Sequence, residues 1–172
     1  MTGRDEYQQR RKEALQAVSS LYFFLFSDAY RELREAEVRC ECYAASRYHF
    51  DDGARFIIDA TERRYPVDDE IWASYGEVLT EIEARIAQAE GRRDERLAAL
   101  KGVHVGLLRF CEQWHLDPAL ITATQPFSAE AVAGLDRTAP VVPSIEVASE
   151  TALALDAEWR RHLQPSEELK VA

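Results

Sequence analysis

The sequence predicts an all-α fold, a helical bundle of about four main helices with a long N-terminal helix and a Pro-linked C-terminal helix. Apolar residues recur at spacings of three and four along most of the chain, which is the period of a helix with one buried face. Only seven Gly and six Pro occur among 172 residues, and β-branched runs are few, which disfavours a sheet. With 47% hydrophobic residues, the chain can bury one good core.

The first predicted helix starts near Arg4 and continues without Pro or Gly to the turn at Asp51-Asp52-Gly53. An unbroken helix to about Phe50 would span about 70 Å, whereas a compact domain of this size has a radius of gyration of about 16 Å. We therefore expect either a break near Ser27-Asp28 or a partner that covers the overhang. The expected buried stripe consists of Leu15, Val18, Tyr22, Leu25, Ala29, Leu33, Ala36, Cys40 and Tyr43.

The run of apolar residues from Leu21 to Phe26 points side chains around the whole helix, so that one neighbouring helix cannot cover it. It is either the most buried turn of the bundle or a self-association surface, because an uncovered aromatic patch of this size is a liability on a monomer. Tyr22, Phe23 and Phe26 are the candidate interface residues in this run.

Two further helices are expected before residue 92. Residues 54–64 are typical of a short helix that ends at Tyr65-Pro66. The acidic residues Asp68-Asp69-Glu70 suit the next helix N-terminus, and an apolar rhythm then continues from Trp72 to Gly91, the expected C-cap.

The helix expected over residues 94–115 has two contrasting faces. One carries large residues, and the roughly opposite one carries Ala98, Gly102 and Gly106. Each Gly inside a helix costs about 1 kcal/mol relative to Ala, and close approach of a neighbouring backbone would offset that cost. We therefore expect the central helix of the bundle here, and these three residues join the candidate interface. The large face consists of Leu100, Val103, Leu107, Phe110 and Trp114.

After Asp117-Pro118 the pattern weakens. Ser128 is a candidate cap for a short helix through Leu135, and a last helix is expected to begin at Ser149 and to end before Pro165. The predicted domains are a helical bundle over 1–136, a linker over 137–148, and a docking helix with its tail over 149–172. The last helix is marginal alone in water, so it docks or swaps, and Trp159 on its apolar face is a candidate interface residue.

Charge and composition limit the kinds of binding partner that the chain can have. The formal net charge is −10, with 31 acidic and 21 basic residues, and the basic residues form dispersed pairs. Such a surface repels phosphate backbones, so no direct nucleic-acid partner is expected. The polar N-terminal residues and the short apolar runs predict a cytoplasmic protein without a membrane contact. Arg is much commoner than Lys, which suits a bacterial source.

A metal site is one alternative function. Cys40, Cys42, Cys111 and His115 could supply a tetrahedral set for zinc, although buried Cys residues are common in cores. Glu112 and His115 form half of a di-iron motif, but no second Glu-x-x-His occurs in the sequence. No cofactor is therefore expected.

The segment from Arg109 to His115 resembles the Arg-(x)4–6-His signature of the HEPN ribonucleases, which are small all-α proteins. That resemblance implies that His115 is the acid/base and that Arg109 binds the phosphate. Phe110 replaces the polar residue that the family usually has after the Arg, and the acidic surface argues against RNA.

Residues 98–102 resemble the His-x-Leu-Lys-Gly core of histidine phosphotransfer domains, which are acidic four-helix bundles. The position that is phosphorylated in those domains is Ala98 here, so the resemblance implies at most a bundle and a docking role. The sequence thus favours a non-enzymatic helical interaction protein, acting as a homodimer or on a partner helix. The alternative is a metal-binding bundle or HEPN-like ribonuclease centred on Arg109, Cys111, Glu112 and His115.

Overall fold

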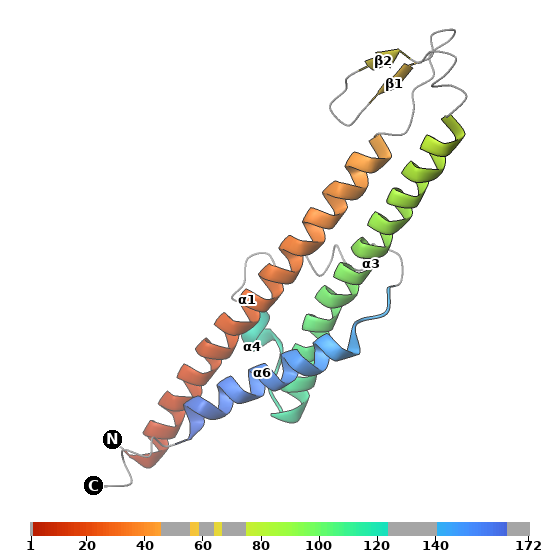
Figure 1. Ribbon diagram of the computed structural model, residues 1–172. Helices are drawn as coiled ribbons and strands as arrows, with labels where there is room; N and C mark the ends of the chain where they lie inside the picture. The colour runs from red at the N-terminus through yellow and green to blue at the C-terminus, as the bar shows by residue number, and fades with distance from the viewer. Residues whose placement is uncertain (1, 46–55, 59–63, 67–74, 124–140, 165–172) are drawn as a thin grey trace. The chain divides into compact units, whose positions relative to one another are not determined.

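The computed structural model describes residues 2–45, 56–58, 64–66, 75–123 and 141–164 (Figure 1). The predicted all-α class is confirmed, because helices make up nearly all of these residues. The elements in chain order are α1 Gly3–Ala45, β1 Phe56–Ile58, β2 Arg64–Pro66, α3 Tyr75–Gln113, α4 Ala119–Thr122 and α6 Ile145–Leu163.

The chain forms two compact units, and α1 and α3 each contribute to both. The first unit contains the chain up to Arg31 and from Leu97 onward, and the second contains the residues from Glu32 to Arg96. Among the described helices, none is long and apolar enough to span a membrane.

The core of the first unit is built from helix faces with the expected spacing. Helices α1, α3 and α6 bury side chains three or four positions apart, which is one face of a 3.6-residue helix. The buried residues are Ala14, Val18, Tyr22 and Phe26 from α1; Leu97, Leu100, Val103, Leu107, Phe110 and Cys111 from α3; Ile121 from α4; and Ala148, Thr151, Leu155 and Trp159 from α6.

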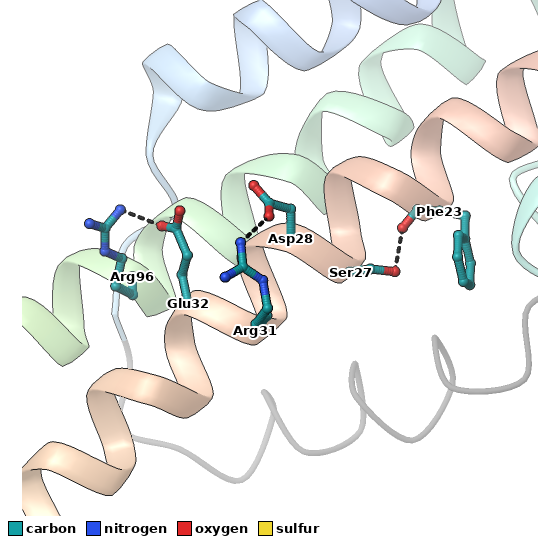
Figure 2. A network of polar contacts seen from close by, with 6 residues as sticks. All are labelled: Phe23, Ser27, Asp28, Arg31, Glu32 and Arg96. Carbon is teal, nitrogen blue, oxygen red and sulfur yellow. Dashed lines mark hydrogen bonds and ion pairs between the residues drawn. The ribbon is translucent and has the colours of Figure 1, made fainter.

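Helix α1 continues through Ser27-Asp28, so the first of the two expected alternatives, a break at this point, is wrong. The Ser27 hydroxyl donates to the Phe23 carbonyl oxygen of its own helix at 2.6 Å, and the Arg31 guanidinium donates to the Asp28 carboxylate at 2.5 Å (Figure 2). Both polar side chains are therefore satisfied within the helix. Neither side chain competes for the backbone hydrogen bonds of the helix, which is why these two polar residues do not end it.

Helix α3 also continues where the sequence suggested an end. Gly91 lies inside α3 and is not a C-cap, so residues 72–91 and 94–115 do not form two separate helices. Gly91 is followed by Arg92-Arg93 and other good helix formers, and no Pro follows it. The cost of about 1 kcal/mol for one Gly is small against the propensity of the surrounding residues.

In the second unit, Leu33 of α1 and Ile86 and Ala89 of α3 are buried. The Arg96 guanidinium of α3 donates to the Glu32 carboxylate of α1 at 2.5 Å, which links the two helices within this unit (Figure 2).

The helix expected over residues 54–64 is wrong where the structure describes it. Residues 56–58 form strand β1, which pairs antiparallel with β2 so that Ile57 lies opposite Tyr65. An aromatic residue followed by two β-branched residues favours a strand, and this preference prevails here over the helical one. The predicted cap at Asp68-Asp69-Glu70 lies outside the described residues.

Helix α6 begins at Ile145, earlier than expected. Ser144 is the N-cap, and its hydroxyl accepts a hydrogen bond from the Val147 N–H at 3.3 Å. Ser149 is inside the helix and donates to the Ile145 carbonyl oxygen at 2.9 Å, so its assignment as the cap is wrong. The helix ends at Leu163, before Pro165 as expected.

The first turn of α6 thus falls inside the stretch 137–148 that was expected to be a linker. The division into 1–136, 137–148 and 149–172 stays a prediction. The helix expected from Ser128 to Leu135 lies outside the described residues. Helix α4 is a single turn after Asp117-Pro118 that the sequence analysis missed.

Candidate functional site

The small face of α3, defined as Ala98, Gly102 and Gly106, lies directly against α6. The Ser144 N–H donates to the Ala98 carbonyl oxygen at 2.9 Å, which fixes the start of α6 on this face. A Cβ added at Gly102 would lie 2.6 Å from the Ser144 carbonyl oxygen, and one added at Gly106 would lie 2.6 Å from the Ala148 carbonyl oxygen. The predicted close approach of a backbone to this face is therefore confirmed, and the approaching backbone belongs to α6 of the same chain.

The second half of α6 is held by an aromatic cluster. The ring of Trp159 lies 6.0 Å from Phe110 and 6.1 Å from Trp114, centroid to centroid. Trp159 is 3% exposed, so this candidate interface residue is part of the core in the described structure. Its indole N–H has no hydrogen-bond partner among the described residues.

An ionic pair borders this aromatic cluster. The Asp156 carboxylate accepts from the Trp114 indole N–H at 2.8 Å and from the Arg160 guanidinium at 2.8 Å. The guanidinium also stacks over the Trp114 ring, 5.1 Å from its centroid. The hydrogen bond from Arg160 lowers the pKa of Asp156, and the bond from Trp114 adds to this effect against the opposing effect of burial. These contacts link the C-terminal ends of α3 and α6.

The aromatic patch of α1 is divided between core and surface. Tyr22 and Phe26 are fully buried, Phe23 is half-buried, and Phe24 is 69% exposed. Phe24, which the sequence did not single out as an interface residue, is thus the most accessible residue of this patch. The Tyr22 hydroxyl lies 3.4 Å from Nδ1 of His104 on α3, and burial, followed by the proximity of Cys111, raises the pKa of Tyr22.

His115 forms the C-terminal cap of α3. Its backbone φ is 50°, in the left-handed region, and its N–H donates to the Glu112 carbonyl oxygen while the Leu116 N–H donates to the Cys111 carbonyl oxygen. This is the Schellman pattern, in which the left-handed position is usually Gly. Leu116 and Cys111 are both buried, as the hydrophobic contact of this motif requires.

Arg109, the other residue of the ribonuclease-like pair, is exposed on α3. One of its guanidinium nitrogens lies 3.1 Å from the Ser149 hydroxyl of α6. The contact joins α3 to α6 beside the small face, so both residues of the pair have a structural role in the described part of the chain.

The cysteines do not form the metal set that was considered as an alternative. Burial raises the pKa of Cys111 to about 11, and the nearby Asp117 carboxylate raises it further, so the thiol stays protonated at neutral pH. Burial also raises the pKa of Cys40, against the opposing effect of Arg93, and Cys42 is exposed. Over residues 2–45, 75–123 and 141–164, no three His, Cys, Asp or Glu side chains are gathered so that they could hold a metal ion.

No family model, curated protein or solved structure matches this chain. The interpretation of its function therefore depends on the residues and contacts described above.

Proposed function

We propose that this chain is a non-enzymatic, cytoplasmic helical interaction protein of bacterial type, an adaptor, scaffold or regulatory subunit. It acts by packing helix α1 against a second copy of itself or against a partner helix. Direct binding of nucleic acid is not part of this proposal, because the net charge of −10 opposes contact with phosphate backbones.

The observation that carries the proposal is the exposure of Phe24. This aromatic side chain is 69% exposed in the middle of α1, while Tyr22 and Phe26 on either side of it are fully buried. A solvent-exposed Phe in a long helix contributes nothing to the core of its own chain. Together with half-buried neighbours it provides apolar surface that association would cover.

The contacts of the residues that were candidates for catalysis or metal binding support the same proposal. Cys111 is a buried, protonated thiol, His115 caps a helix, and Arg109 contacts Ser149. Catalysis requires such groups to converge on a shared space with perturbed pKa values that favour reaction. In the described residues they serve helix packing instead, which favours the interaction protein over the ribonuclease or metal alternative.

Sedimentation equilibrium of the purified chain over a wide concentration range tests the proposal. We expect the mass to rise from that of one chain toward that of two. A mass that stays at one chain at the highest concentration, together with cleavage of RNA that is lost in His115→Ala, would support the ribonuclease alternative. Stoichiometric zinc or iron in the purified protein would support the metal alternative.

A further inference from the structure

One side of α1, next to its buried face, carries a short apolar stripe that ends at the exposed Phe24. Ala17, Leu21 and Phe24 follow one another at spacings of four and three, so they share one side of the helix. That side flanks the buried stripe that contains Val18 and Tyr22, because successive residues are turned by about 100° around the helix axis. Ala17 and Leu21 are half-buried, and the Phe24 ring makes an edge-to-face contact with Phe23 at 6.0 Å.

Charged residues continue this stripe in both directions. Arg10 precedes it by two helical turns, and Asp28 follows it by one turn. The Asp28 side chain is 63% exposed and contacts Arg31, which is 62% exposed, on the same side of α1 (Figure 2). A surface ion pair of this kind is worth little by itself, so Asp28 can accept a second cation at little cost.

The residues of one α1 helix are complementary to those of a second α1 helix that runs in the opposite direction. Arg10 and Asp28 are equally far along the helix from Ser19, and so are Ala17 and Leu21. In an antiparallel pair of α1 helices centred there, each Arg10 lies opposite an Asp28, and each Ala17 lies opposite a Leu21. A two-fold axis repeats both contacts, and a small residue opposite a large one allows close packing.

We propose that this stripe binds a second copy of the chain, with the two α1 helices antiparallel and Arg10 of each copy paired with Asp28 of the other. This inference rests on the proposed function and specifies its partner and its surface. Phe24 then covers the space between the helices next to Ala17 of the partner chain. Within the stripe, neither Arg10 nor Asp28 faces a like charge in this register, whereas a parallel pairing would place Arg10 beside Arg10.

The first test compares two substitutions that are matched in exposure. Phe24 and Leu153 are both 69% exposed, and Leu153 lies on α6. We expect Phe24→Gln to raise the dissociation constant of the dimer at least tenfold and Leu153→Gln to leave it unchanged, with circular dichroism confirming that both variants stay helical. Equal effects of the two substitutions would overturn the proposal.

A charge exchange tests the antiparallel pairing directly. Arg10→Asp alone and Asp28→Arg alone each place like charges opposite each other, so each variant should sediment as a monomer. An equimolar mixture of the two should form a heterodimer, because each contact then joins opposite charges. A mixture that stays monomeric, or single variants that dimerise like the unaltered chain, would overturn the proposal.

The outcomes separate this inference from the proposed function. If the unaltered chain dimerises and these variants do too, the surface assigned here is wrong and the interaction role stands. If the unaltered chain is a monomer at every concentration, self-association fails for both.

Discussion

Replacing Gly106 by Ala should destabilise the protein, although the same change at Gly91 in the same helix should stabilise it. In an exposed helix interior, Ala is better than Gly by about 1 kcal/mol. A Cβ at Gly91 meets no atom within 4 Å, so Gly91→Ala should gain close to that amount.

At Gly106 the added methyl group meets α6. It would lie 2.6 Å from the Ala148 carbonyl oxygen and 2.6 Å from the Thr151 Cβ, and neither atom can move without its backbone. Relief requires α6 to shift by roughly 1 Å, and a gap of that size forfeits a quarter to a half of the dispersion energy of each affected contact. Overpacking of this kind typically costs about 1–3 kcal/mol, which exceeds the gain in helix propensity.

Urea unfolding followed by circular dichroism provides the free energies of unfolding. We expect Gly106→Ala to lower the value by about 2 kcal/mol and Gly91→Ala to raise it by about 1 kcal/mol. Equal stabilisation by both substitutions would refute the contact between α6 and the small face, because the change in helix propensity is the same at both sites.

Three further predictions concern the ends of helices and one carboxylate. His115→Gly should raise the free energy of unfolding by about 1 kcal/mol because it removes a left-handed non-Gly residue, and a loss of stability in the same urea assay would contradict the Schellman assignment. Ser144→Ala should lower it by about 1 kcal/mol, while Ser149→Ala, away from the cap, should change it little; the reverse order would restore Ser149 as the cap. Asp156 has a lowered pKa in the folded state, so it contributes stability above its ordinary pKa of 3.8 that is lost as the pH falls through the lowered value. Asp156→Asn should therefore weaken the acid dependence of thermal unfolding below about pH 4, and an unchanged dependence would exclude the pairing with Arg160 as its cause.

The sequence predicted the parts of the fold that one periodic face determines. The large face of α3 follows directly from apolar spacing. Of the stripe expected in α1, only Val18, Tyr22 and Leu33 are buried, and Ala14 and Phe26 belong to the observed stripe instead. The prediction for Gly102 and Gly106 also succeeded, because two costly Gly residues one turn apart in an apolar helix need a physical reason. Only the identity of the approaching segment required three-dimensional information.

Two of the errors concern the residues at which helices begin and end. Gly91 is a helix-ending signal by residue type, but a C-cap needs a left-handed backbone position, and α3 adopts that conformation at His115. Ser144 and Ser149 are both acceptable caps, and the contact of Ser144 with Ala98 selects between them. Tertiary contacts decided both cases, and a single sequence does not contain them.

The aromatic patch of α1 shows a different limit of prediction from sequence. The sequence placed Tyr22, Phe23 and Phe26 at an interface, but which side of a uniformly apolar turn faces the core depends on where α3 lies. Tyr22 faces the core, where its hydroxyl lies 3.4 Å from Nδ1 of His104. Phe24 is consequently exposed, and it became the candidate only when its exposure was known.

Amide hydrogen exchange along α6 most directly tests the claim that α6 is held on the small face of α3. We expect the α6 amides to be protected in the unaltered chain and in Gly91→Ala, and to exchange at least tenfold faster in Gly106→Ala. If α6 exchanges equally in all three proteins, the small face does not hold this helix.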